Sequence, residues 1–554
     1  MESRSDDDGS RVMRWSPSAG ITQVAYGVGS EMHAYGGGVF TPSHLGVWWV
    51  SGADGQIWLG DRRITSGSWQ YGDLCFADGL LLAVREGSAG DELVSIDARS
   101  FALTVLRRAA FIASPTLQEG RVAWVEWPSD AMPWDHAEVW TATIERPERS
   151  TCIAGGAGEA ATQPSWGPDG RLYLMSDRSG WWNLYRTARD GIEAIAPMGA
   201  ECTDALWELG YRSVAHLASG RIALLARNGP DQHLVVREPD ASIRTLPLPY
   251  TSFKPYLVEL NGTLALIAAT SQEKQQIILV EVESDNPPMI IRGDPSSAAD
   301  VSLPEILTID SSGQSVTLLL YRPSGEHGSG RRPLIVRAHP GPTHQAETRL
   351  DPEIQYFTRR GFAVADVDYH GSTGYGRAFR TSLNGQWGEL DVADCISAAD
   401  ALIKSDVADP ETVFVSGSSA GGYTALRAVA RRDTPFALAV ARSAIVDPRT
   451  WTLTAPRFQR AHAATLSHDS ANVDPAAICR PVLLIHGLAD HVAPAEDTRS
   501  LATALNERGL LSGYLPLPGV GHYLSGTNVE RAALEAELAA YERVLTSQQQ
   551  ADRE

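Results

Sequence analysis

The first half of the chain repeats a pattern of short strands in which apolar and polar positions alternate. Each unit has a turn rich in Gly, Asp or Asn, an alternating apolar strand, and a second strand that often carries Trp or Tyr. Examples are ADGLLLAVREG from Ala77 and DGRLYLMSDRSGWWNLYR from Asp169. We count six such units between Tyr35 and Ile291, at intervals of about 40 residues. This spacing predicts a β-propeller of six or seven blades over residues 1–300, rather than a β-sandwich.

The pattern changes after a polar stretch that begins at Ser324. Short runs that are apolar throughout now alternate with amphipathic segments, of which two begin at Asp391 and Glu530. Strands of a parallel sheet are covered on both faces and therefore read as continuous apolar runs. The sequence predicts a doubly wound α/β domain over residues 301–554, with strands at PLIVRA, FAVADVD, TVFVS, LAVA and PVLLI.

The third of these strands leads into a G-x-S-x-G motif, from Gly417 to Gly421. In an α/β-hydrolase this motif forms a sharp turn between a strand and a helix, and its central serine is the nucleophile. The motif therefore predicts an α/β-hydrolase with Ser419 as its nucleophile. Ser418 is adjacent, but it precedes the centre of the turn and is expected to point into the fold.

A serine hydroxyl needs a base, and the base needs a group that orients it. Asp490 follows the strand PVLLI, and His522 follows the next strand, which is the chain order that this fold requires. We expect His522 to be the base and Asp490 the acid. His486 and His491 flank Asp490 but lie on the wrong side of the last strand to serve as the base, so they are expected to be loop residues. Glu496 and Asp497 are the alternatives for the acid, although both are typical of the first turn of a helix.

Amide hydrolysis also requires hydrogen-bond donors for the charge that develops on the carbonyl oxygen. The backbone N–H of Ala420 is one expected donor. The loop after PLIVRA should supply the second, and Pro340 has no N–H to offer. The candidates are the Gly341 amide and the His339 side chain.

Composition narrows the classes of partner. The 554 residues include 67 Asp and Glu against 47 Lys and Arg, a formal charge of −20 that disfavours nucleic acid and anionic membranes. The first ten residues are polar and acidic, which does not predict a signal peptide, no long apolar run occurs, and the five cysteines have no metal-binding spacing. We expect a cytoplasmic protein with reduced thiols and no metal or organic cofactor. A homo-oligomer is possible, although no sequence feature decides it.

Several motifs together resemble the prolyl oligopeptidase family of serine peptidases, and in particular its bacterial acylaminoacyl-peptidase, dipeptidyl-aminopeptidase and puromycin-hydrolase-like members. They are HPGPTH from His339, DYHGSTGYGRAFR from Asp368, GSSAGGY, HGLADHVAP and GVGHYL. VEWPSDAMPWD from Val125 adds a match in the first half. The resemblance spans about residues 33 to 545.

The resemblance implies that the propeller restricts entry to short peptides or peptide-like small molecules. It also implies that Glu126 pairs with a free substrate α-amine, and that Trp127 and Trp134 line the same substrate-binding region. For Glu126 the alternative is a charge at the end of a strand, and for these two tryptophans it is packing within a blade.

The chain departs from the family at three places. Pro340 replaces a glycine, residues 441–467 are unlike the family's usual stretch, and the region before EMHAYGGG (from Glu31) is shorter than in relatives. The leading hypothesis is a serine peptidase that acts as an aminopeptidase or acylaminoacyl-type exopeptidase. The alternatives are an amidase, esterase or acyl transferase acting on an amide-bearing natural product, and a propeller-based binding protein without activity.

Overall fold

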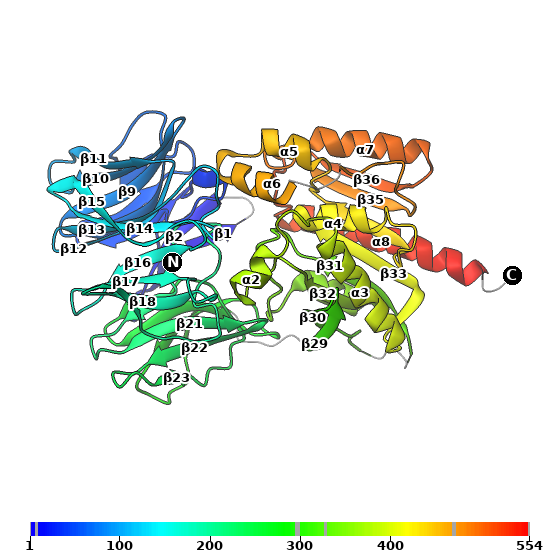
Figure 1. Cartoon of the computed structure of the whole chain (residues 1–554), viewed down its shortest axis with the longest axis horizontal. Coiled ribbons are helices and arrows are strands. Elements are labelled where there is room, and N and C mark those ends of the chain that lie inside the picture. Colours follow the sequence, from blue (N-terminus) through cyan, green and yellow to red (C-terminus); the bar gives the residue numbers. More distant parts are fainter. Residues whose placement is uncertain (1, 6–8, 294–299, 326–329, 468–471, 552–554) are drawn as a thin grey trace. The chain divides into compact units, whose positions relative to one another are not determined.

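The computed structural model describes all residues except 1, 6–8, 294–299, 326–329, 468–471 and 552–554 (Figure 1). The chain divides into two compact units. The first contains residues 1–228, 232–268 and 276–293, and the second contains residues 229–231, 269–275 and 294–554. The main boundary therefore lies a few residues before the expected one at 300.

The first unit is built from six sheets of four or five strands, which are the six blades of the propeller. Five have four strands in antiparallel order, and the sixth has a fifth strand, β25, paired with β26. The strands of the first three blades are β4 (Phe40–Ser43), β5 (Gly46–Val50), β6 (Ile57–Leu59), β7 (Arg62–Arg63), β8 (Gln70–Ala77), β9 (Leu80–Gly87), β10 (Gly90–Asp97), β11 (Leu103–Ala109), β12 (Phe111–Gln118), β13 (Arg121–Trp127), β14 (Glu138–Thr143) and β15 (Arg146–Gly155). Those of the other three are β16 (Ala161–Trp166), β17 (Leu172–Ser176), β18 (Asn183–Ala188), β19 (Gly191–Ala194), β20 (Val214–His216), β21 (Ile222–Asn228), β22 (Asp231–Arg237), β23 (Ile243–Thr245), β24 (Ser252–Phe253), β25 (Val258–Leu260), β26 (Thr263–Ala269), β27 (Gln276–Glu281) and β28 (Met289–Arg292).

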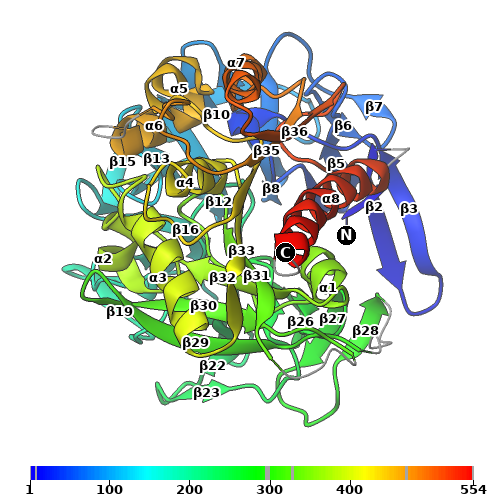
Figure 2. The same ribbon diagram turned by 90° about the vertical axis from the view of Figure 1, so that its right-hand side faces the viewer.

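A separate three-stranded sheet precedes the blades. It contains β1 (Glu2–Ser5), β2 (Gly9–Ser16) and β3 (Gly20–Tyr26), and the short 3₁₀ helix η1 (Met32–Ala34) follows it. Val12 and Ala25 of this sheet are buried in the same core as Trp48 and Val50 of the first blade. Figure 2 shows the β2–β3 hairpin in dark blue beside β5 and β6. The propeller thus has six regular blades, and the N-terminal strands pack against the first of them.

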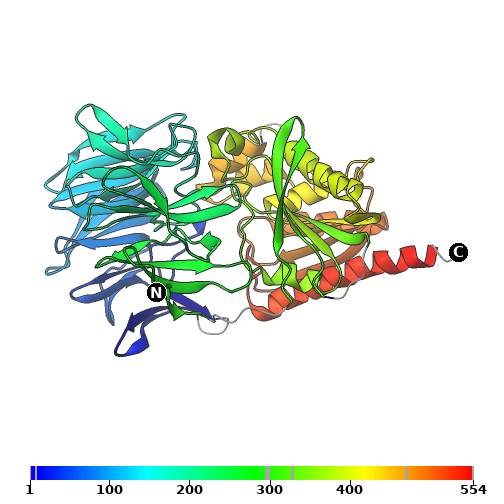
Figure 3. The same cartoon turned by 90° about the horizontal axis from the view of Figure 1, so that it is seen from below.

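The second unit is organised around one eight-stranded sheet (Figure 3). The strand order is β29-β30-β32-β31-β33-β34-β35-β36. β29 and β30 pair in antiparallel fashion, and the strands from β32 to β36 are parallel. All five predicted parallel strands are present. The strands are β29 (Pro304–Ser311), β30 (Gln314–Tyr321), β31 (Arg332–Ala338), β32 (Ala363–Asp368), β33 (Ala408–Ser418), β34 (Leu438–Arg442), β35 (Val482–Gly487) and β36 (Leu511–Leu517).

Helices cover both faces of this sheet. The α-helices are α1 (Pro352–Thr358), α2 (Gly376–Thr381), α3 (Leu390–Lys404), α4 (Ala420–Ala428), α5 (Pro448–Thr454), α6 (Arg460–Ser467), α7 (Ala495–Glu507) and α8 (Thr527–Ala551), and the 3₁₀ helix η2 (Arg457–Gln459) precedes α6. Neighbouring residues of one strand enter opposite cores, as the two-residue period of a strand requires: Ile335 packs with α1 and α8, and Val336 with α3 and α4. Figure 2 shows α8 and α3 on opposite sides of the strands.

A buried ion network joins the sheet to α1 and α8. The Arg442 guanidinium of β34 contacts Glu537 of α8 and donates to Glu353 of α1, at 2.9 and 3.0 Å. Burial raises the pKa of Glu537, and the opposing charge of Arg442 lowers it. Two long charged side chains inside the fold are tolerated only because they neutralise each other.

Replacing Glu537 should remove the buried one of the two carboxylates that neutralise Arg442 and leave Glu353, which is partly exposed. Glu537→Gln is expected to destabilise the second unit by about 3 kcal/mol, because breaking a buried ion pair costs more than forming it gains. Urea unfolding followed by tryptophan fluorescence measures the effect. Glu535→Gln, at an exposed position of the same helix, is the control and should change stability by less than about 0.5 kcal/mol. Equal midpoints for the two variants would contradict a stabilising role for the network.

Candidate active site

Ser419 lies at the sharp turn between β33 and α4, in a conformation that few residues adopt. Its φ is 55° and its ψ is −116°. A Cβ on Gly417 would lie 2.1 Å from the Gly421 carbonyl oxygen, and a Cβ on Gly421 would lie 2.1 Å from that of Ala338. The two glycines are therefore required because the turn brings the backbones into direct contact, and the strain falls on the residue between them.

The backbone of Ser419 is held on both sides. Its N–H donates to the Arg442 carbonyl at 2.9 Å, and its carbonyl accepts from the N–H of Tyr423 at 3.2 Å and of Ile445 at 3.4 Å. Arg442 and Ile445 belong to the end of β34 and the segment after it, which the sequence marks only as divergent from the family. This segment therefore helps to fix the strained turn.

The side chains of Ser419, His522 and Asp490 form a continuous hydrogen-bonded chain. His522 Nε2 lies 3.0 Å from Ser419 Oγ, and His522 Nδ1 lies 2.8 Å from Asp490 Oδ2. The serine follows β33, the aspartate follows β35 and the histidine follows β36. The structure thus brings together the three predicted residues, while Ser418 is the last residue of β33 and pairs with Arg442 of β34.

Asp490 is held as an anion by several donors. Its Oδ1 accepts from the backbone N–H groups of Val492 at 2.8 Å and Ala493 at 2.9 Å, and its Oδ2 lies 3.3 Å from His486 Nε2. Burial alone would raise the pKa of Asp490, but the hydrogen bonds from His486 and His522 hold that pKa well below its usual range. An anionic Asp490 keeps the proton of His522 on Nδ1, so Nε2 is free to accept the serine proton.

The alternative acids and bases have other roles. His486 is fully buried and lies between the Ala493 carbonyl, at 3.1 Å from its Nε2, and the Thr498 hydroxyl, at 2.8 Å from its Nδ1. Glu496 and Asp497 lie in the first turn of α7, as their pattern predicts. His486 was expected to be a loop residue, yet it lies in β35 and supports Asp490.

Of the two expected oxyanion donors, one lies at the start of α4 and the other lies in the loop after β31. Ala420 is the first residue of α4, where a backbone N–H has no acceptor within the helix. Gly341 has a φ of +123° and follows Pro340 in the loop after β31. This loop begins directly after Ala338, the last residue of β31. The loop lies close to Gly421, because a Cβ on Gly421 would lie 2.1 Å from the Ala338 carbonyl oxygen. The Gly341 amide therefore remains the predicted second donor.

The His339 side chain is committed to other partners. Its Nδ1 lies 2.9 Å from the Pro340 carbonyl, its Nε2 lies 2.7 Å from the Ser372 hydroxyl, and its ring stacks on Tyr369 at 4.2 Å. Burial lowers the pKa of His339 to about 3, so the ring is neutral. With both nitrogens occupied, the ring has no spare donor, and this argues against His339 as an oxyanion donor.

Glu126, Trp127 and Trp134, for which substrate-binding roles are predicted, lie among packed side chains of the first unit. Glu126 is 8% exposed, and its carboxylate accepts two hydrogen bonds from Arg107, at 2.6 and 3.1 Å, and one from Trp124 Nε1 at 2.6 Å. Trp127 stacks on Phe111 at 5.1 Å, and Trp134 packs against Trp207 at 4.5 Å. The three side chains are parts of the packed blades, and the Glu126 carboxylate is already neutralised by a guanidinium.

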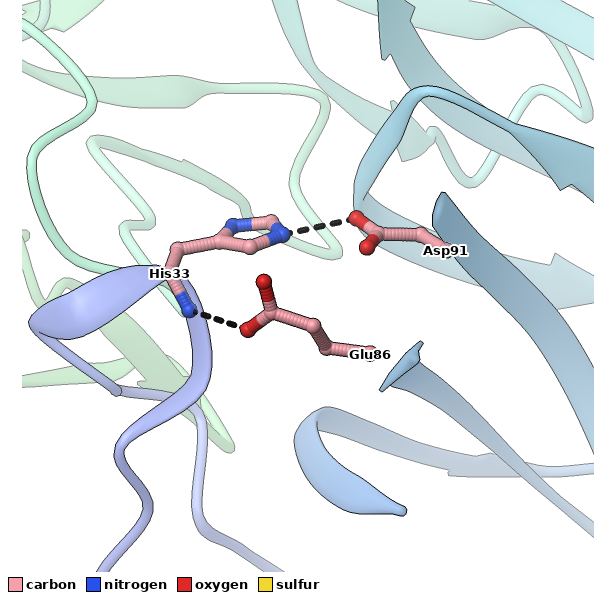
Figure 4. Close-up of side chains that lie close together, drawn as sticks. All are labelled: His33, Glu86 and Asp91. Carbon is pink, nitrogen blue, oxygen red and sulfur yellow. Dashed lines mark hydrogen bonds and ion pairs between the residues drawn. The ribbon is translucent and has the colours of Figure 1, made fainter. Parts of the chain in front are cut away.

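One group of metal-ligand residues occurs in the part of the chain that the structure describes (Figure 4). His33 Nε2 lies 2.7 Å from Asp91 Oδ2, and the His33 backbone N–H donates to Glu86 Oε2 at 2.8 Å. Asp91 Oδ2 also accepts the N–H of Ile112, from the next blade, at 2.9 Å. These hydrogen bonds connect η1 to two neighbouring blades. We therefore assign the cluster a structural role.

A buried carboxylate connects α3 to the nucleophile helix. Asp391 accepts from the Thr424 hydroxyl of α4 at 2.5 Å and from the Gly388 N–H at 2.6 Å. Burial raises the pKa of Asp391 to about 6, against the lowering effect of these hydrogen bonds. The folded protein therefore binds a proton at Asp391 more tightly than the unfolded chain does.

This shift predicts a pH dependence of stability that Asp391→Asn removes. The contribution of Asp391 is fully present below pH about 4 and is lost as pH rises through about 6. Between pH 7 and 4.5 the wild type should therefore gain on the order of 2 kcal/mol relative to the variant. Unfolding midpoints of both proteins at the two pH values measure this. Asp433→Asn, at an exposed position, is the control and should show the same change in stability between the two pH values as the wild type. If Asp391→Asn also showed that change, the raised pKa of Asp391 would be contradicted.

No helix in the described part of the chain is long and apolar enough to cross a membrane.

Comparisons with known proteins agree with the fold. A structure of a Mycobacterium tuberculosis puromycin-hydrolyzing peptidase is similar over 98% of this chain and 92% of its own, with a TM-score of 0.92 and 28% identity. A crystal structure of puromycin hydrolase gives the same coverage with a TM-score of 0.90 and 25% identity.

Curated sequences match the chain over shorter segments. The uncharacterized peptidase YuxL of Bacillus subtilis is 28% identical over 42% of this chain, and the acylamino-acid-releasing enzyme of Arabidopsis thaliana is 28% identical over 35% of it. These matches span only 38% and 28% of the relatives' own lengths. Residues 348–548 of this chain, which contain the whole triad, match the model of the prolyl oligopeptidase family.

Proposed function

We propose that the protein hydrolyses amide bonds of short peptides through an acyl-enzyme on Ser419. The observation that carries the proposal is the hydrogen-bonded chain from Ser419 Oγ to His522 and on to Asp490, at 3.0 and 2.8 Å. These distances are those that proton transfer from a nucleophile to its base requires. The family match over residues 348–548 supports the same reaction class.

Each residue of the site has a defined part in the reaction. Ser419 Oγ attacks the substrate carbonyl carbon, and His522 Nε2 takes its proton. The amides of Ala420 and Gly341 stabilise the oxyanion that forms, and His522 then protonates the leaving amine. A water molecule, deprotonated by His522, attacks the ester on Ser419 and releases the acid product. Asp490 stabilises the imidazolium in both steps.

The substrate is proposed to be an exopeptidase substrate, either an N-terminal aminoacyl or an acylaminoacyl residue. Similarity to an acylamino-acid-releasing enzyme and to the dipeptidyl aminopeptidase BIII of Pseudoxanthomonas mexicana supports this proposal. The propeller is proposed to restrict the substrate to short chains. All five cysteines lie among the described residues and are free thiols, which agrees with action in the cytoplasm.

A second candidate is hydrolysis of an amide in a small natural product. The whole-chain likeness to a puromycin-hydrolyzing peptidase favours it, because that likeness includes both units. Turnover of free and N-acetylated di- and tripeptides, measured beside turnover of puromycin and aminoacyl anilides, separates the two. A higher kcat/KM for peptides supports the exopeptidase, and exclusive turnover of puromycin would replace it with the amidase.

A further inference from the structure

A buried histidine of α6 contacts the loop that carries the predicted oxyanion donor. His462 is 3% exposed, and its Nε2 lies 3.1 Å from the carbonyl oxygen of Gly341. A carbonyl oxygen can only accept, so Nε2 carries the proton and donates it. His462 lies in residues 441–467, the stretch in which the sequence departs from its family.

Gly341 is the residue of this loop that most needs to be held. Its φ of +123° lies in a region that glycine enters freely, and a Cβ would lie 2.8 Å from the Thr343 backbone nitrogen. Pro340 and Pro342 stiffen the chain on either side. The directions of the Gly341 N–H and C=O are linked through the φ and ψ of this one residue. A hydrogen bond to the C=O therefore also restrains the N–H.

His462 is itself fixed by aromatic packing that leads to the nucleophile helix. Its ring meets Trp451 edge to face at 6.4 Å, Trp451 packs on Trp387 at 5.8 Å, and Trp387 packs on Tyr423 of α4 at 4.2 Å. Burial lowers the pKa of His462 to about 4, so the ring is neutral and keeps its single donor role at neutral pH. The same packed side chains thus contact the Gly341 loop and α4, which are the two elements that supply the expected oxyanion donors.

We propose that His462 is a positioning residue that holds the Gly341 peptide so that its amide can stabilise the oxyanion. The proposal rests on the proposed function, because it assigns a support for the transition state of that reaction. It also gives the diverged segment a specific role, since α6 supplies a hydrogen bond to a loop that Pro340 has already stiffened.

Two variants of equal polarity and different reach test this proposal. In His462→Gln the amide nitrogen can reach the position of Nε2, whereas in His462→Asn it stops near the position of Nδ1. We expect the Asn variant to lose about 10- to 100-fold in kcat with KM within about two-fold, since a misplaced donor acts only in the transition state. The Gln variant should remain within about three-fold of the wild type.

The second readout is the affinity of an aminoacyl boronic acid, whose tetrahedral adduct on Ser419 places an oxygen in the oxyanion hole. Its dissociation constant should rise in the Asn variant by the same factor as kcat/KM falls, because both report the same site. Leu466→Ala is the matched control: it removes a buried side chain of the same helix that packs in the domain core. It should lower thermal stability and leave kcat within about two-fold.

Each contrary result has a defined meaning. Equal kcat values for the Asn and Gln variants would overturn the proposal, and so would a Leu466→Ala variant that loses kcat to the same extent as His462→Asn. Loss of peptide binding with unchanged boronic acid affinity would also overturn it. The proposed function fails separately, if the wild type forms no covalent adduct with a fluorophosphonate; in that case all variants lack activity alike.

Discussion

Ser419→Ala is expected to lower kcat by about 10⁶-fold, to the level that binding and the oxyanion donors alone provide. Among the described residues, Ser419 is the one whose hydroxyl lies at hydrogen-bond distance from His522 Nε2, at 3.0 Å. The substitution removes one oxygen atom from a partly buried position at the start of a buried helix, so the fold should be preserved. Hydrolysis of an aminoacyl anilide, followed with enough enzyme to detect the residual rate, measures the loss.

Ser418→Ala is the matched control for this variant. Ser418 precedes the turn, at the end of β33, and the two serines have similar size and partial burial. We expect Ser418→Ala to keep kcat within about ten-fold of the wild type, since it loses no group from the reaction. Substantial turnover in Ser419→Ala, or a larger loss in Ser418→Ala, would contradict the assignment of the nucleophile.

Asp490→Asn has the second largest expected effect, a fall in kcat of about 10⁴-fold. An asparagine can still accept the backbone N–H groups of Val492 and Ala493 with its oxygen. Its NH₂ group then faces His522 Nδ1 and forces the imidazole proton onto Nε2. In that tautomer Nε2 donates to Ser419 Oγ and cannot accept its proton. Steady-state kinetics, together with a crystal structure of the variant, would separate this loss from a change of fold.

Asp497→Asn provides the control for the acid. Asp497 is the neighbouring carboxylate that the sequence alone left as an alternative, and it lies in the first turn of α7. Its substitution should cost less than about 1 kcal/mol in stability through the helix dipole and leave kcat nearly unchanged. If kcat fell by about 10⁴-fold in Asp497→Asn while Asp490→Asn stayed active, Asp497 and not Asp490 would be the acid of the triad.

The fold was predictable wherever a segment had one clear pattern of apolar and polar residues. The parallel strands β31 to β35 are apolar throughout because both faces of the sheet are covered. The blades could be predicted from turns at regular intervals, although the central strands of several blades, such as β10 and β13, are buried on both faces. The strands β1 to β3 were not predicted as a sheet of their own. They lie in a polar segment where Val12 and Ala25 are among the few residues that reach the core.

The triad was predictable because each residue follows its own strand, so its position depends only on local sequence and the order of the fold. The role of Glu126 was not predictable in this way. Its partner Arg107 lies on β11 of the preceding blade, and no sequence pattern indicates which guanidinium a folded blade brings to a carboxylate. The backbone contact of Arg442 with Ser419 and the contact of His462 with Gly341 are of the same kind, since they join residues that lie 23 and 121 positions apart in the chain.

The most direct test of the central claim is mass spectrometry of the protein after reaction with a fluorophosphonate. We predict one adduct per chain, mapped to Ser419 in the peptide that contains GSSAGGY, and a labelling rate that falls sharply in Asp490→Asn. An adduct on another residue, or an unlabelled protein that still hydrolyses peptides, would contradict the account.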